Sequence, residues 1–286
     1  MPYVIHGQAG RNFRRRRFLQ SGPPNSRKTG ALLTMPGRIA ILSLPGEKGW
    51  DTVPTDDPRI VGYNWERGDG PRDSKAIVAE VFDTSVRIIG SGDYDSIGPD
   101  GLHKFYDYIL DDVSGGNWFE RDLNDVDLDR DFGKFFGAAQ KRFMDYLSVV
   151  MHSAVPVVGM TSWDAPEKDR AKKPSETSYD YARTVGSHLY PDLPGKVAKA
   201  IIGEFTMVFH NSVGKLKPND AEEIGLWQTR PYGQVWGCGV KAPSAIGKRI
   251  PTFVPADYQY FDQMYTYLEE LVAKERAVNP TLEEKS

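Results

Sequence analysis

The chain has 286 residues, enough for one large α/β domain or two small ones. Hydrophobic residues make up 40% and charged residues 26%, as in an ordinary globular protein. No apolar run approaches the roughly eighteen residues of a membrane span. The N-terminus lacks the apolar core of a secretory signal. Because Cys238 is the single cysteine, the chain cannot form an internal disulfide, and we expect this side chain to be buried among apolar residues. We therefore expect a cytoplasmic protein without a membrane partner.

Charge is distributed unevenly along the chain, although its sum is small. The net charge is −3, which does not indicate a nucleic-acid-binding protein. Arginines gather at 11–17, acidic residues at 107–131 and basic residues again at 168–173. Each run is also what an ordinary solvated surface carries.

The first ordered elements form a βαβ unit. Residues 17–21 predict a short buried strand, and a Pro- and Ser-rich loop follows at 22–29. A short helix at 30–35 ends where Pro36 and Gly37 interrupt it. Residues 39–44 are apolar and rich in β-branched side chains, which predicts a second buried, parallel strand.

The rest of the chain continues the α/β alternation. Strands are expected at 60–66, 155–163 and 205–213, with a weak strand inside 94–101; helices are expected at 73–88, 102–113, 131–153, 193–205 and 258–277. Long loops are expected at 112–130 and 164–187, and a β-hairpin at 226–241 with its turn at 231–233.

Residues 22–29, GPPNSRKT, fill seven of the eight places of the phosphate-binding pattern G-x-x-x-x-G-K-[ST]. Successive backbone N–H groups of such a loop point at phosphate oxygens, and the following helix presents its positive end to the same anion. Lys28 would reach the terminal phosphates, and the Thr29 hydroxyl would hold Mg²⁺. The predicted nucleotide-binding residues are Gly22, Pro23, Pro24, Asn25, Ser26, Arg27, Lys28 and Thr29.

Arg27 is the departure from the pattern, because glycine usually stands there for its conformational freedom. An arginine fits if φ stays negative and the side chain points outward, where it could add a phosphate contact. The alternative is a Pro- and Ser-rich turn before a helix, without any ligand.

The segments 22–29, 43–49, 94–110, 155–164, 193–205 and 226–241 together resemble RecA-like ATPases. The resemblance covers about residues 17–250 and is greatest to phage-encoded RecA-like P-loop proteins of single-strand annealing and recombination. It implies a RecA-like α/β domain over 1–256, with a mostly parallel sheet flanked by helices and a late β-hairpin. Residues 257–286 would form a C-terminal helix and polar tail.

The resemblance also implies ATP and Mg²⁺ as cofactors and assigns roles to three further residues. Glu47 would orient or deprotonate the attacking water; an ordinary loop carboxylate is the alternative. Thr161 or Ser162, at the end of the strand 155–163, would sense the γ-phosphate, unless they only satisfy the strand end.

Asp100 would end a buried strand and support Mg²⁺ through water. The residues before it include Gly98 and Pro99, which make a poor central strand. A short strand, weakened metal support or a plain Pro-Asp-Gly turn are the alternatives that this composition leaves open.

The loop 164–187 corresponds in position to the DNA-binding loop of RecA-like recombinases, which implies single-stranded DNA as a partner. Its candidate DNA-binding residues are Lys168, Arg170, Lys172, Lys173, Tyr179 and Arg183. A plain surface loop is the alternative.

Arg230 and Lys241 lie on the expected hairpin, where RecA-like filaments carry basic residues that reach a neighbouring subunit's nucleotide. Arg230 would then stabilise the transferring phosphoryl group in trans, which implies a homo-oligomer. Two ordinary surface cations are the alternative.

The leading interpretation is ATP hydrolysis coupled to single-stranded DNA binding, in phage-type recombination or replication within an infected bacterium. One rival is a catalytically degenerate P-loop protein with a structural or assembly role, which Arg27 and the SIGP stretch at 96–99 favour. Another is an ATPase that acts on protein partners. The histidines at 103, 152, 188 and 210 show no metal-ligand spacing, so structural zinc is not expected.

Overall fold

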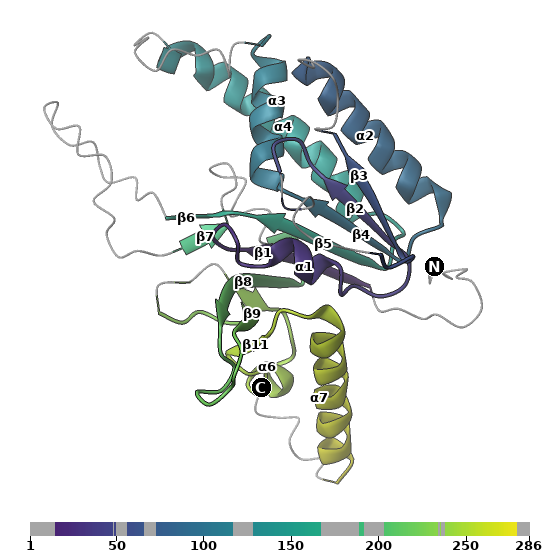
Figure 1. Ribbon diagram of the computed structural model, residues 1–286, viewed down its shortest axis with the longest axis vertical. Helices are drawn as coiled ribbons and strands as arrows, with labels where there is room; N and C mark the ends of the chain where they lie inside the picture. The colour runs from purple at the N-terminus through teal and green to yellow at the C-terminus, as the bar shows by residue number, and fades with distance from the viewer. Residues whose placement is uncertain are drawn as a thin grey trace, which may run out of the picture.

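The computed structural model describes residues 15–47, 49, 56–65, 73–116, 128–166, 189–191, 203–233, 235 and 238–278. This part of the chain forms an α/β structure with one mostly parallel sheet and helices on both of its faces (Figure 1). The expected α/β class with a mostly parallel central sheet is therefore confirmed. The architecture is compatible with a RecA-like fold and equally with a Rossmann-like fold.

The strands of the main sheet lie in the order β11-β9-β8-β1-β5-β4-β2-β3, with β10 beside β8. From β8 to β3 all neighbours are parallel, whereas β9, β10 and β11 pair antiparallel. The strands are β1 (Arg16–Ser21), β2 (Ile39–Ser43), β3 (Ile60–Asn64), β4 (Ser96–Asp100), β5 (Val157–Ser162), β8 (Met207–Gly214), β9 (Ile224–Gln228), β10 (Gly239–Val240) and β11 (Phe253–Pro255).

Two hydrophobic cores lie on opposite faces of this sheet. The helices are α1 (Lys28–Leu32), α2 (Ser74–Ser91), α3 (Leu102–Val113), α4 (Leu128–Met151), α6 (Ser244–Gly247) and α7 (Tyr258–Val278). Helices α2, α3 and α4 cover one face, and α1, α6 and α7 cover the other (Figure 1). Successive strand side chains alternate between the cores, so Phe18 joins the α7 core and Leu19 the α3 core.

Local chemistry explains where α2 begins and ends. The Asp73 carboxylate caps the helix by accepting a hydrogen bond from the backbone N–H of Lys75. Gly92 ends it with φ of 70°, a left-handed conformation that glycine adopts without steric cost.

Helix α7 packs into the core of its face through an aromatic cluster. Phe261 is 1% exposed and meets Phe209 edge-on, with ring centroids 5.1 Å apart. Trp227 stacks on Phe209 with centroids 4.4 Å apart and donates its indole N–H to the Gln20 side chain at 3.0 Å. The C-terminal helix therefore shares one core with β1, β8 and β9.

Strand β4 confirms the expectation that Asp100 ends a buried strand and contradicts the alternative of a Pro-Asp-Gly turn, because all five residues of SIGPD are buried in the middle of the sheet. It pairs with β2 along its whole length but with β5 only at Ser96 and Ile97. Pro99 thus lies beyond the pairing with β5, where its missing N–H costs less. A Cβ atom on Gly98 would lie 2.8 Å from Ile41 Cδ1, so glycine fits the close packing there.

The prediction of a hairpin across 226–241 is wrong, because the two strands in this range, β9 and β10, do not pair with each other. Strand β9 pairs with β8 and β11, and β10 pairs with β8, so the late antiparallel hairpin consists of β8 and β9. The Gln228 side-chain amide donates to the carbonyl oxygens of Arg230 at 2.9 Å and Tyr232 at 3.2 Å. These bonds hold the segment after β9 as a loop.

The long loop expected at 164–187 begins with a strand instead. Strand β6 (Asp164–Pro166) pairs antiparallel with β7 (Leu189–Pro191), which makes a two-stranded ribbon directly after β5. The residues between these strands lie outside the described residues. The same holds for the helix expected at 193–205, except for its last residues.

Candidate functional site

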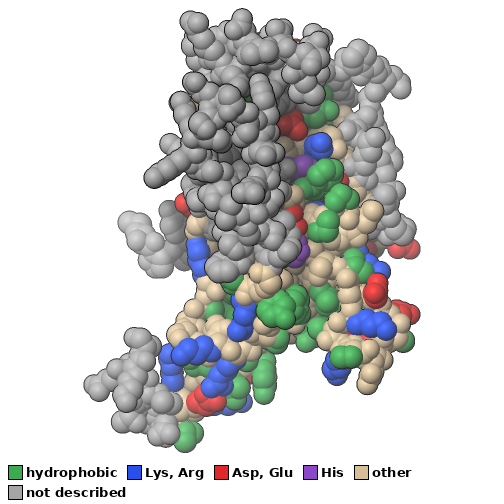
Figure 2. Space-filling model, turned by 90° about the vertical axis from the view of Figure 1, so that its left-hand side faces the viewer, with side chains coloured by type: hydrophobic (Ala, Val, Ile, Leu, Met, Phe, Trp, Pro, Cys, Tyr) green, Lys and Arg blue, Asp and Glu red, His purple; other side chains and the backbone are tan. Residues whose placement is uncertain are grey.

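The candidate site lies where four parallel strands end. Strands β1, β5, β4 and β2 finish at Ser21, Ser162, Asp100 and Ser43, and the loops that follow them meet at one edge of the sheet. Ligands of open α/β sheets bind at this edge. Viewed onto this edge, Figure 2 shows histidine side chains beside acidic and basic ones.

The loop 22–29 curls back over the end of β1 and leads directly into α1. Asn25 and Arg27 have φ of 63° and 62°, in the left-handed region. A Cβ atom on Gly22 would lie 2.6 Å from both the Asn211 carbonyl oxygen and Ser26 Oγ, so only glycine fits where the loop begins.

For Arg27, the expectation of a negative φ is wrong and the expectation of an outward-pointing side chain is confirmed. Its φ is positive rather than negative, and a left-handed conformation costs a non-glycine residue about 1–2 kcal/mol. The side chain is exposed, as expected, and lies along β9. A Cβ atom on Gly225 would be 3.4 Å from Arg27 Cβ, so the glycine leaves room for the arginine to pass.

The Lys28 side chain folds back over its own loop. Its ammonium donates to the carbonyl oxygens of Gly22 at 2.9 Å and Pro23 at 2.8 Å, and lies 3.4 Å from Ser26 Oγ. The residue is 8% exposed. These contacts place the ammonium at the mouth of the loop, between its first and last residues.

Carboxylates oppose the effect of burial on Lys28. Burial lowers the pKa of Lys28, and the negative charges of Asp100, Glu47 and Asp164 act in the opposite direction. Three acidic side chains therefore lie within electrostatic range of one ammonium. Such an arrangement favours retention of the positive charge on Lys28.

Asp100 is bound by two hydroxyl groups. It is 1% exposed and accepts a hydrogen bond from Thr29 Oγ1 at 2.7 Å and another from Thr161 Oγ1. The Thr161 oxygen in turn accepts from the Gly101 N–H at 2.8 Å. Burial raises the pKa of Asp100, while both hydroxyls and Lys28 lower it. The two predicted metal ligands, Thr29 and Asp100, are thus in direct contact.

Glu47 lies beside this pair on the loop after β2. Its Oε1 accepts from the Gly49 N–H at 3.1 Å. A Cβ atom on Gly101 would lie 2.6 Å from Glu47 Cβ, and one on Gly49 would lie 2.4 Å from Thr29 Oγ1. The loop carrying Glu47 therefore covers the contact between Thr29 and Asp100.

The sequence analysis assigned no role to four polar residues that lie at this edge, which are His103, Asp164, His210 and Asn211. Asp164 Oδ2 lies 3.0 Å from His210 Nδ1, although not with the geometry of a hydrogen bond. Within the described residues, both ring nitrogens of His103 and both amide atoms of the fully buried Asn211 have no hydrogen-bond partner. The signal that could have found His103 is its position in the first turn after Asp100.

Two groups of predicted residues are not brought to this edge. Arg230 donates to the Gly247 carbonyl oxygen at 3.3 Å, and the Lys241 ammonium donates to Gly203. A role of Arg230 in a neighbouring subunit stays a prediction. The candidate DNA-binding residues between 168 and 183 lie outside the described residues.

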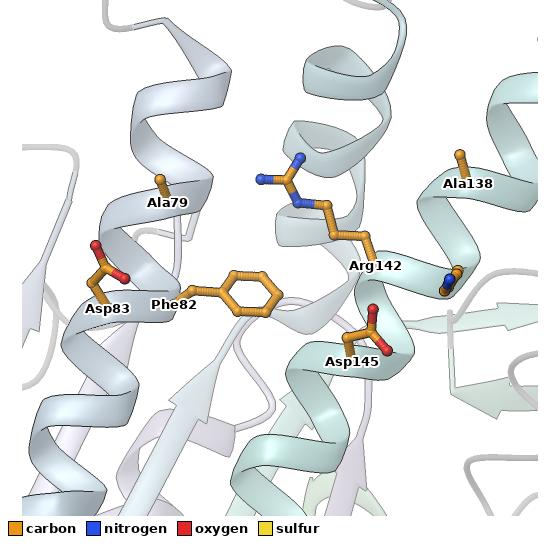
Figure 3. A pocket seen from close by; sticks show the side chains of 7 residues that line it. Ala79, Phe82, Asp83, Ala138, Arg142 and Asp145 are labelled. Atoms are coloured by element: carbon orange, nitrogen blue, oxygen red, sulfur yellow. The ribbon is translucent and has the colours of Figure 1, made fainter.

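A hollow in the described part of the chain lies elsewhere, between α2 and α4. It measures about 540 Å³ and is lined by Ala79, Phe82, Asp83, Ala138, Lys141, Arg142 and Asp145 (Figure 3). Phe82 and Arg142 extend toward each other from the two helices (Figure 3). Because none of the predicted site residues lines this hollow, the polar strand edge remains the better candidate.

Comparison with protein-family models finds no match, and comparison with curated proteins finds none either. Within the described ranges, no helix combines the length and the apolar character that crossing a bilayer requires. Among the same residues, no three His, Cys, Asp or Glu side chains are grouped as a metal site would need. Cys238 is buried, as expected.

Proposed function

We propose that the protein binds ATP with Mg²⁺ at this strand edge and hydrolyses it. The observation that supports this most is the direct hydrogen bond between Thr29 and Asp100, next to the Lys28 ammonium. A loop with a lysine and a hydroxyl residue, followed by a helix and facing a buried carboxylate, has the parts that phosphoryl transfer uses.

The residues present fit the cofactor. Thr29 and Asp100 offer hydroxyl and carboxylate oxygens, the hard donors that Mg²⁺ prefers. Magnesium takes only one or two protein ligands and completes its shell with water and phosphate, so a cluster of three acidic or histidine ligands is not required. When bound, Mg²⁺ would neutralise charge on the phosphates.

Each side chain then has a role in the reaction. Lys28 would exchange its contacts with Gly22 and Pro23 for oxygens of the β- and γ-phosphates. Thr29 and Asp100 would hold the metal, and Glu47 would orient the attacking water from the adjacent loop. Thr161 would act by fixing the Asp100 carboxylate.

We further propose that hydrolysis is coupled to binding of single-stranded DNA. The support is that the candidate DNA-binding segment is joined in the chain to the nucleotide site. The ribbon of β6 and β7 begins at Asp164, which is within electrostatic range of Lys28. The sequence between the two strands contains the basic and aromatic residues. Such side chains bind phosphates and stack on bases. This function takes place in a homo-oligomer if Arg230 acts in trans.

The test is phosphate release from Mg²⁺-ATP, with and without single-stranded DNA. We expect turnover that DNA stimulates and that Lys28→Ala abolishes. Lys75→Ala is the matched control, because Lys75 is exposed on α2, distant in sequence from the loop. DNA affinity should fall steeply with salt concentration. Turnover equal to that of Lys28→Ala would refute the catalytic proposal.

One observation favours a second candidate, a P-loop protein that binds nucleotide without turnover. Arg27 occupies the left-handed position that the pattern gives to glycine, so its side chain and its strain are additions to the phosphate loop. Saturable ATP binding that Lys28→Ala weakens, without phosphate release, would identify this candidate. Turnover stimulated by a protein and not by DNA would instead indicate an ATPase with a protein partner.

A further inference from the structure

His103 lies within electrostatic range of Lys28, at the candidate site. It lies in the first turn of α3, three residues after Asp100, and is 8% exposed. Its ring stacks on Trp163, with centroids 4.5 Å apart and planes 30° apart. The Lys104 ammonium lies 5.2 Å from the centroid of the same indole. The imidazole is therefore fixed between the strand end that carries Asp100 and the one that carries Thr161.

The fixed ring makes no hydrogen bond that would explain its burial. Neither Nδ1 nor Nε2 has a partner among the described residues. A buried donor or acceptor left without a partner destabilises the folded state, so the polar atoms of structural histidines in protein interiors are normally hydrogen-bonded. Each such unpartnered group in a folded protein needs an explanation, and a ligand that bonds to the ring at this site supplies one.

The ring also lies near the ammonium that would bind phosphate. The charge of Lys28 acts on His103, as does the charge of Lys104. Burial, together with these two cations, lowers the pKa of His103 to about 3. The imidazole is consequently neutral near pH 7 and has one N–H to donate. A neutral imidazole of this kind can polarise an oxygen of a substrate.

We propose that His103 is a further binding residue of this site, donating a hydrogen bond from its neutral imidazole to an oxygen of the terminal phosphate of the nucleotide. This inference rests on the proposed ATP binding. It adds recognition of the third phosphate: His103 distinguishes a nucleoside triphosphate from a diphosphate, while Lys28 and the loop bind both.

The test compares the affinities of the full-length protein for ATP and ADP by titration calorimetry, with Mg²⁺ present. We expect His103→Phe to weaken ATP binding by about tenfold or more and to change ADP binding less than twofold, because the hydrogen bond that is lost goes to a charged group. His103→Gln, which keeps a donor, should recover part of the loss. His152→Phe is the control, since His152 is exposed beyond α4.

The outcomes separate the two proposals. If the wild-type protein binds neither nucleotide, the proposed function fails. If it prefers ATP and His103→Phe keeps that preference, this inference alone is overturned. A merely structural histidine would lower ATP affinity, ADP affinity and thermal stability together. The wild-type preference for ATP should also stay constant between about pH 6 and pH 8, because burial and the charges of Lys104 and Lys28 keep the imidazole of His103 neutral over this range. A preference that requires a protonated imidazole would contradict the assignment.

Discussion

Truncating Phe261 should show whether the C-terminal helix is an integral part of the fold. The side chain is 1% exposed and contacts the rings of Phe209 and Trp227, with centroid distances of 5.1 and 6.3 Å. Phe261→Ala removes a whole buried ring, and the neighbouring aromatic side chains are too rigid to fill the space. We therefore expect a loss of about 3–5 kcal/mol in the free energy of unfolding.

The assay is urea unfolding followed by tryptophan fluorescence, because Trp227 reports on the same cluster. The neighbouring Tyr260 provides a matched control: it is also aromatic and on α7, but 46% exposed, so Tyr260→Ala should change stability by less than about 0.5 kcal/mol. Equal effects of the two substitutions would refute the assignment of α7 to the core. So would a loss below about 1 kcal/mol for Phe261→Ala.

Three further substitutions test particular contacts, each by urea unfolding. Gly159→Ala should destabilise the protein by about 1–3 kcal/mol, because the added Cβ would lie 2.2 Å from Phe18 Cζ. Gly137→Ala, in open space on α4, should stabilise it by about 0.5–1 kcal/mol. The reverse order of stabilities would contradict the packing around Gly159. Arg27→Gly should stabilise by about 0.5–1 kcal/mol, since relief of the left-handed conformation outweighs the added chain entropy, and a loss would show that the packing against β9 dominates. Asp100→Asn should stabilise the protein near pH 7, because burial raises the pKa of Asp100 above 3.8 and so penalises its charged form. The gain in stability should vanish as the pH falls below 3.8, where the carboxyl group is protonated in both the folded and the unfolded protein. A gain that persists in acid would rule out this cause.

Much of the fold could be predicted from local patterns. The apolar runs that became β1, β2 and β5 are flanked by glycine, proline and polar residues, so their bounds follow from burial and turn chemistry alone. The candidate phosphate-binding loop could be predicted because all of its residues, 22–29, are contiguous in the sequence. The contact of Thr29 with Asp100 followed from the resemblance, which gave both residues to one metal.

The features that the sequence did not reveal depend on contacts between residues far apart in the chain. Gly98 and Pro99 argue against a strand locally, but β2 and the tight packing around Ile41 decide otherwise. The partners of β9 depend on β8 and β11, which no spacing within 226–241 reveals. His103 and Trp163 are sixty residues apart, so their stacking, and with it the candidate role of His103, needed coordinates.

The contacts of Lys28 have a consequence for selectivity. An anion that approaches the loop competes with two carbonyl oxygens and a hydroxyl that already hold the ammonium. Small anions such as chloride or a single phosphate offer few compensating bonds, so the exchange gains them little. A nucleoside triphosphate bound as proposed would also accept hydrogen bonds from the backbone N–H groups of the loop, which would compensate for the bonds that Lys28 gives up. If the loop binds ATP, the folded-back lysine would therefore disfavour the simple anions that are abundant in any cell.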